Sequence, residues 1–151
     1  MTTVAKVDLQ RYLGTWYEIY RLPNRFEDAD CNTVTAKYSL NDDADIQVLN
    51  TCHKPGGSNE AKGLAKIVDP KSNAKLKVSF FRPFYGDYWI LDLAPDYSWV
   101  LIGEGSGKYF WILARKSKLS DSDEQMLLEK AAQMGYMTER FIKPKNTLRL
   151  N

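Results

Sequence analysis

The feature that most constrains the fold is a series of short segments, between about residue 14 and residue 115, in which apolar and polar side chains alternate. In the segment Lys75–Phe80, every second side chain from Leu76 onward is apolar, as in a strand with one buried face. Clusters of turn residues separate such segments at 41–45, 55–59, 69–73 and 103–107. Eight strands of about seven residues, joined by short turns, predict an all-β fold, an eight-stranded antiparallel up-and-down β-barrel.

The first strand is expected to begin at Gly14 and to carry a large indole, Trp16, on its buried face. A tryptophan buries roughly 150–250 Å², so the groups that cover Trp16 help to determine the fold. The preceding residues, Asp8–Leu13, predict a short helical turn that Asp8 caps. This turn is expected to plug one end of the barrel.

One α-helix is predicted after the barrel, at about residues 121–134. Ser120 is expected to cap its first turn. Leu127, Ala131 and Met134 follow at helical spacing, so their apolar side chains share one face. This face is expected to pack on the outside of the barrel wall.

The 151 residues are enough for one domain with its own core, so a single domain is expected over 1–151. Within it, the barrel spans about 14–115 and a short last strand is expected at about 139–143. The tail after Pro144 is expected to be loose, as chain ends often are.

The composition excludes several functional classes. With 21 Lys and Arg against 19 Asp and Glu, and no long basic block, the chain is not expected to bind nucleic acid. No apolar run is long enough to span a membrane, and residues 1–6 lack the apolar core of a signal peptide. Removal of an export signal from a longer chain would leave the same pattern. Two cysteines and one histidine, His53, predict neither a metal site nor a cofactor.

Three motifs occur in order along the chain: Gly14-x-Trp16-Tyr17, Asp96-Tyr97 and, at the end of the eighth strand, Arg115. Together they resemble the motifs of lipocalins, in the branch of the bacterial, plant temperature-induced and apolipoprotein D proteins, and the resemblance extends from about Asp8 to Ile142. Pro95 stands where this family often has threonine. The resemblance implies that a structural floor, in which the arginine packs over the tryptophan, consists of Gly14, Trp16, Asp96, Tyr97 and Arg115.

The resemblance also implies a cavity for one small ligand inside the barrel. By similarity to apolipoprotein D, it is lined by the aromatic pair Tyr38 and Trp111 and by the polar Asn50, and by similarity to related barrels Tyr88 points inward while Trp89 points outward. Strand parity from an inward Trp16 adds Val34, Ala36 and Val48 to the lining. Ordinary core packing is the alternative explanation for each residue.

The mouth of the barrel is expected at the loops 22–31, 54–60, 82–87 and 103–108. Phe84 is expected to contact the ligand there, since Phe84 and Tyr85 are apolar in an otherwise polar rim. The cations placed to meet an anionic head group are Arg25, Arg82 and Lys108. Ordinary solvated side chains explain each cation equally well.

Cys31 and Cys52 lie at the two ends of the first hairpin, where they could form a disulfide. Cys31 has the parity of the outward Thr33, whereas Cys52 has the parity of the inward Val48, so a bridge is expected to need a bulge. The sequence leaves the paired and unpaired states open. A disulfide would imply an oxidising compartment.

These observations predict a non-catalytic protein that binds, transports or stores a small hydrophobic ligand, such as a fatty acid or lysophospholipid. Two alternatives are an enzyme acting on a lipophilic substrate with Cys52 as its nucleophile, and a tetrapyrrole-binding lipocalin. The expected state is a monomer or weak homodimer with peripheral membrane association. By resemblance to the bacterial branch, the expected location is the periplasm, the outer membrane or, for a secreted protein, outside the cell.

Overall fold

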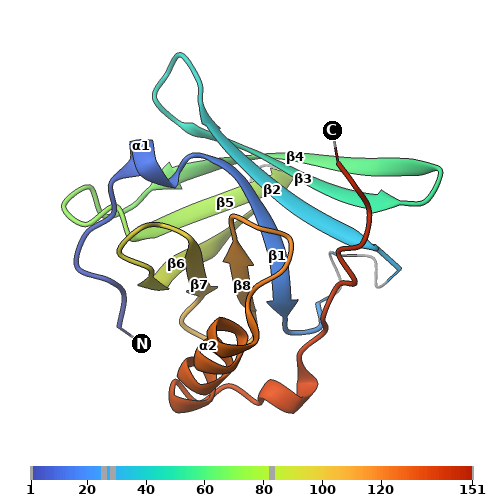
Figure 1. Ribbon diagram of the computed structural model, residues 1–151. Coiled ribbons are helices and arrows are strands. Elements are labelled where there is room, and N and C mark those ends of the chain that lie inside the picture. The colour runs from blue at the N-terminus through green and yellow to red at the C-terminus, as the bar shows by residue number, and fades with distance from the viewer. Residues whose placement is uncertain (1, 25–26, 28–29, 82–83, 151) are drawn as a thin grey trace.

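The described residues of the computed structural model are 2–24, 27, 30–81 and 84–150, with the backbone alone at 81, 84 and 85. They form a closed antiparallel barrel in which each strand pairs with the next and the last pairs with the first (Figure 1). The strands are β1 Gly14–Arg21, β2 Thr33–Leu40, β3 Ile46–Lys54, β4 Gly57–Ile67, β5 Lys75–Phe81, β6 Phe84–Leu93, β7 Trp99–Gly103 and β8 Phe110–Ala114. The predicted eight-stranded up-and-down barrel is thereby confirmed.

Two hydrophobic cores lie on the two sides of the barrel wall. The inner core includes Trp16, Tyr38, Val48, Leu76, Ile90, Ile102 and Leu113. The outer core joins Leu101, Phe110 and Ile112 to residues of the C-terminal helix. Because β7 and β8 are therefore covered on both faces, their sequences are continuously apolar and do not alternate.

The helix of the outer core is α2, Asp121–Gln133, which begins where the Ser120 side chain accepts a hydrogen bond from the Asp123 amide. Leu127 and Ala131 are fully buried against the barrel. Figure 1 shows α2 outside the barrel. No helix within the described residues is both long enough and apolar enough to cross a membrane.

The chain after α2 differs from the expected short strand at 139–143 and from the expected loose tail. A 3₁₀ turn occupies Thr138–Arg140, and a single bridge joins Ile142 to Arg21, because Arg21 is the last residue of β1 and Pro144 has no amide hydrogen to continue a ladder. Further along, Asn146 is 6% exposed. Its side-chain amide donates to the Glu18 carbonyl at 2.8 Å, which holds the tail against the barrel.

Two expected mouth loops are also shorter than predicted. β6 begins at Phe84, so residues 84–87 of the expected loop 82–87 are strand. β3 runs to Lys54 and β4 begins at Gly57, so only Pro55 and Gly56 form the turn and the region 54–60 is mostly strand. Gly56 has a φ of +86°, a backbone conformation that glycine adopts without the strain of a Cβ. The tight turn lets the β3–β4 hairpin project as a long ribbon (Figure 1).

The floor of the barrel is built around Trp16 and Arg115. The Arg115 guanidinium lies 3.7 Å from the centre of the Trp16 ring and donates to the backbone carbonyls of Thr15, Arg11, Tyr12 and Tyr97 at 2.7–3.3 Å. Helix α1, Leu9–Tyr12, is capped by Asp8 as predicted and lies over this end.

Gly14 and the turn between β6 and β7 complete the floor. Gly14 has a φ of +103°, and a Cβ there would lie 3.3 Å from an Arg115 nitrogen, so a side chain would be strained and would crowd the guanidinium. The Tyr97 hydroxyl accepts a hydrogen bond from the Asp8 amide at 2.8 Å, and the Asp96 carboxylate accepts from the Ser98 amide and hydroxyl.

Replacing Arg115 with lysine should destabilise the fold by about 2–3 kcal/mol, because an ammonium cannot reach four carbonyls and stack on an indole at once. The free energy of unfolding in urea measures the effect. Lys116→Gln, at an exposed neighbouring position, is the control and should change stability by less than about 0.5 kcal/mol. Equal stability of the two variants would contradict the role of Arg115 in closing the floor.

Candidate ligand-binding site

Three tyrosines form a hydrogen-bonded network inside the barrel, above the floor. The hydroxyls of Tyr12 and Tyr88 lie 2.5 Å apart, and Tyr88 donates to Tyr38 at 2.9 Å. Burial raises the pKa of Tyr38 to about 12, and burial likewise raises the pKa values of Tyr12 and Tyr88. All three are therefore neutral at physiological pH.

The network lines a very small cavity. Its volume is about 10 Å³, and it is bounded by Tyr12, Tyr38, Ile46, Ala65, Leu76, Val78 and Tyr88. A volume of this order accommodates about one water molecule. The floor half of the interior is therefore packed, and a larger ligand there would have to displace side chains.

The inner face is less completely covered nearer the mouth. Tyr38 lies opposite Val48 and both are buried, whereas the next inner pair, Ala36 opposite Asn50, is half-buried. Val34, two residues nearer the mouth on β2, is also half-buried and shares the face of Ala36, because every second side chain of a strand points to the same side.

The structure brings most of the sequence-predicted lining residues to the inner face of the barrel. Tyr38, Val48, Ala36, Tyr88 and Trp111 all pack in the inner core, and Trp89 packs in the outer one. Val34 and Asn50 follow by register. The Phe84 side chain and the residues Arg25 and Arg82 lie outside the described part of the structure, and Lys108 is exposed.

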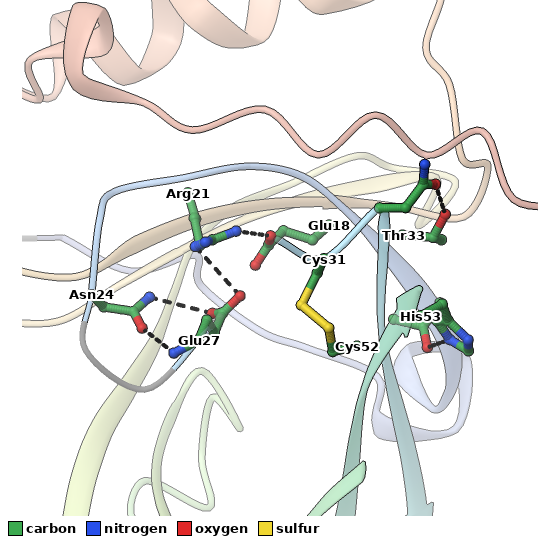
Figure 2. The surroundings of a disulfide bond; sticks show 10 residues. Glu18, Arg21, Asn24, Glu27, Cys31, Thr33, Cys52 and His53 are labelled. Atoms are coloured by element: carbon green, nitrogen blue, oxygen red, sulfur yellow. Dashed lines mark hydrogen bonds and ion pairs between the residues drawn. A yellow bond between two sulfur atoms is a disulfide. The ribbon is translucent and has the colours of Figure 1, made fainter. Parts of the chain in front are cut away.

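A polar cluster that the sequence analysis missed lies at the mouth end of the interior. Arg21 is 2% exposed, and its Nη1 donates to Glu18, 3% exposed, at 2.9 Å. The Glu27 carboxylate accepts a hydrogen bond from Trp111 Nε1 at 2.8 Å and lies 3.5 Å from Arg21 Nε. Figure 2 shows Glu18, Arg21 and Glu27 pointing toward one another.

An irregularity in β1 directs both Glu18 and Arg21 into the barrel. The β1–β8 register shifts between Glu18 and Tyr20, so that Glu18 opposes Leu113 and Arg21 opposes Trp111, and both partners belong to the inner core. Glu18, two residues after Trp16, has the inward parity of that residue. Without the shift, Arg21 would have pointed outward, which is why parity alone could not find the cluster.

The electrostatics of the cluster are set by burial. Burial raises the pKa of Glu18 well above its usual range, and the neighbouring Glu27 carboxylate raises it further, while Arg21 acts in the opposite direction. Burial therefore disfavours the charged form of Glu18, and Glu27 is the second carboxylate within ion-pair distance of Arg21.

Next to this cluster, Cys31 and Cys52 form a disulfide, with 2.00 Å between the sulfur atoms and 5.3 Å between the Cα atoms (Figure 2). The bulge expected for this bridge is absent, since the β2–β3 register is continuous from Thr33 to Leu40. Cys31 precedes β2, so strand parity does not apply to it. The bridge ties the chain entering β2 to the mouth end of β3.

Among the described residues we looked for side chains that could ligate a metal ion and for the contacts of the single histidine, His53. The described residues contain no group of three or more His, Cys, Asp or Glu side chains that could hold a metal ion. Nε2 of His53 lies 3.0 Å from the Thr35 hydroxyl, and burial lowers the pKa of His53. Burial alone would raise the pKa of Glu104, but hydrogen bonds from the Ser106 hydroxyl and from amides of the same turn lower it.

A closed barrel of eight strands is just wide enough to enclose one small ligand. With one end sealed by Arg115 and an apolar inner wall that is half-exposed toward the other end, the fold and the site define a small ligand-binding β-barrel. The family model of the lipocalin-like domain matches residues 7–146 of this chain. The chain belongs to this lipocalin-like family, whose members bind small hydrophobic ligands.

Individual relatives agree with this assignment and confirm the resemblance in the motifs. The chain is 40% identical over 144 residues to temperature-induced lipocalin-1 of Arabidopsis thaliana, covering 90% of this chain and 77% of the relative. It is also 40% identical over 144 residues to the outer membrane lipoprotein Blc of Escherichia coli K12, covering 94% and 81%. Apolipoprotein D of Mus musculus is 40% identical over 107 residues, covering 70% and 54%.

The barrel is also similar to a solved structure. Insecticyanin from the tobacco hornworm Manduca sexta superimposes with a TM-score of 0.73, at 20% sequence identity, over 95% of this chain and 83% of that one. At this identity the similarity concerns the fold alone.

Glu18→Gln should become more stable than the wild-type protein as the pH rises. Because the pKa of Glu18 is raised on folding, its contribution to stability is fully present below the unfolded pKa of about 4.3 and is lost above it, by about 1.4 kcal/mol per pH unit until the folded pKa is reached. Glutamine carries no proton to lose. Urea unfolding at pH 5, 6.5 and 8 measures the difference.

Glu139→Gln, at an exposed position, is the control and should give a difference from wild type that does not change with pH. If the difference in free energy of unfolding between Glu18→Gln and the wild-type protein is also independent of pH, a raised pKa at Glu18 is contradicted.

Removing the disulfide through Cys31→Ser with Cys52→Ser should lower the free energy of unfolding by about 3 kcal/mol, as for a closed loop of about 20 residues. Dithiothreitol should lower the stability of the wild-type protein by the same amount and leave the double variant unchanged. Intact-protein mass spectrometry after alkylation measures the pairing, and two alkylated cysteines without reductant would contradict the bridge.

Proposed function

We propose that the chain binds a single-chain amphiphile, either a fatty acid or a lysophospholipid, inside the mouth half of the barrel. Its hydrocarbon lies along the inner wall and its polar head lies beside Trp111. One observation carries the proposal: along the inner face, Tyr38 and Val48 are buried, whereas Ala36 and Asn50, nearer the mouth, are half-buried. Covering this wall removes apolar surface from water.

The packed floor restricts the depth of the site. Since the cavity beside Tyr38 has a volume of about 10 Å³, the hydrocarbon ends above the tyrosine network unless side chains move. Burial of about 14 methylenes contributes about 11 kcal/mol gross. An association cost of ~4–15 kcal/mol reduces this sum, so micromolar affinity is the expected scale.

Binding without catalysis is the proposal because the alternative nucleophile is engaged. An enzyme of the kind considered above requires a free Cys52 thiolate, and Cys52 Sγ is bonded to Cys31. The same bridge supports an oxidising location. Together with the relative named an outer membrane lipoprotein, this leads us to propose the cell envelope or the extracellular space as the location.

Ala36→Trp should weaken binding of the fluorescent probe 11-(dansylamino)undecanoic acid at least about tenfold, because an indole on the inner face fills the proposed volume. The measurement is the dissociation constant from dansyl fluorescence, with oleic acid as competitor.

Lys37→Trp is the matched control. Lys37 is the exposed neighbour on the opposite face of β2, so the same added side chain should leave affinity unchanged. A probe that binds both variants as tightly as the wild-type protein is not bound inside the barrel, and that result would overturn the proposed function.

A further inference from the structure

The polar cluster at the mouth contains a buried cation, Arg21, and one of the two carboxyls beside it comes from a loop and not from a strand of the barrel. Arg21 is 2% exposed, and a buried guanidinium requires a partner of opposite charge. Glu18 is the nearer carboxyl at 2.9 Å, but its burial favours the protonated form. The negative charge is therefore supplied by Glu27, which belongs to the connection between β1 and β2 and not to a strand.

The Glu27 carboxylate is well hydrogen-bonded through one oxygen atom but not through the other. Its Oε1 accepts hydrogen bonds from Trp111 Nε1 at 2.8 Å and from the Asn24 side chain at 3.3 Å. Its Oε2 lies 3.5 Å from Arg21 Nε, and within the described part of the chain both of these buried atoms lack a hydrogen-bond partner. A guanidinium nitrogen that is buried and unpaired is a costly arrangement, and a better-placed oxyanion would remove that cost.

The two donors, in contrast, are fixed in the barrel wall. Arg21 on β1 and Trp111 on β8 oppose each other directly in the strand register, so their nitrogens converge on one region at the mouth end of the inner face. Two N–H donors on neighbouring strands match the two oxygens of a carboxylate.

We propose that Arg21 and Trp111 form a carboxylate-binding site for the head group of the ligand, and that the Glu27 side chain occupies this site until the ligand displaces it. This inference rests on the proposed function, since it assigns the head group of the same amphiphile. It commits to a fatty acid over a neutral lipid of the same chain length.

The charge balance gives the site its selectivity. When a fatty-acid carboxylate replaces the Glu27 carboxylate, Arg21 keeps one negative partner throughout. When a fatty alcohol enters, Glu27 keeps its place, because its departure would leave Arg21 buried without a counter-charge, and the hydroxyl stays outside the head-group position. The acid should therefore bind better than the alcohol of equal length.

The test compares the dissociation constants of dodecanoic acid and 1-dodecanol at pH 8, by displacement of the dansyl probe, in the wild-type protein and in Glu27→Gln. Removing the competing charge should raise the affinity for dodecanoic acid about tenfold and leave that for dodecanol within twofold. Glu60→Gln, which removes an exposed carboxylate on β4, should change neither. Dodecyl phosphate serves as a second anion, and a gain for it that exceeds the gain for dodecanoic acid would reassign the site to phosphate head groups and overturn the carboxylate assignment.

Arg21→Lys tests the cation directly, because it keeps the charge and removes Nε. The preference for acid over alcohol should fall at least about fivefold, and a urea unfolding curve establishes that the variant is folded. If it does not fold, Trp111→Phe removes the second donor and should give the same loss of preference.

The outcomes separate this inference from the proposed function. If the wild-type protein and Glu27→Gln bind both compounds with an unchanged ratio of affinities, the head-group site is wrong while the barrel still binds lipid. If neither protein binds either compound or the probe, the proposed function itself fails.

Discussion

The stacking of Arg115 on Trp16 is the interaction on which the rest of the barrel depends. It closes one end, since the guanidinium lies 3.7 Å from the indole centre and also holds the α1 backbone through the carbonyls of Arg11 and Tyr12. Only a sealed end excludes water from the tyrosine network above it. At the opposite end, Glu18 and Arg21 are also buried, and in a buried environment electrostatic interactions are strong and unpaired groups are costly.

Much of this arrangement could be predicted from the sequence, because strand parity is a local property. Alternation in β2 and β3 placed Ala36 and Val48 on the inner face, and the resemblance to apolipoprotein D placed Tyr38 there, where all three pack. Arg21 could not be predicted to point inward, since the register shift after Glu18 has no marker in the residue pattern. The inward position of Glu27 could not be predicted either, because its hydrogen-bond partner Trp111 is 84 positions away in the chain.

The mouth is held together by three long-range contacts that the sequence did not reveal with certainty. The disulfide joins Cys31 to Cys52, and the tail joins the same region through the Asn146 amide, which donates to the Asn32 carbonyl at 2.8 Å. The Asn146 side chain also holds the Glu18 carbonyl. Because these contacts converge beside the polar cluster, they fix the backbone of β1 and β2 where Glu18 and Arg21 turn inward, which pre-organises the donors before a ligand binds.

The two ends of the interior differ in what they can offer a ligand, and this difference sets its orientation. The tyrosine hydroxyls near the floor are neutral, with the pKa of Tyr38 at about 12, and they satisfy one another in a space of about 10 Å³. The charge at the floor, on Arg115, is already engaged by the Trp16 ring and four backbone carbonyls, so it does not serve an ionised head group. A positive charge is buried only at the mouth cluster among the described residues, so an anionic amphiphile lowers its free energy most with its head toward the mouth and its hydrocarbon toward the floor.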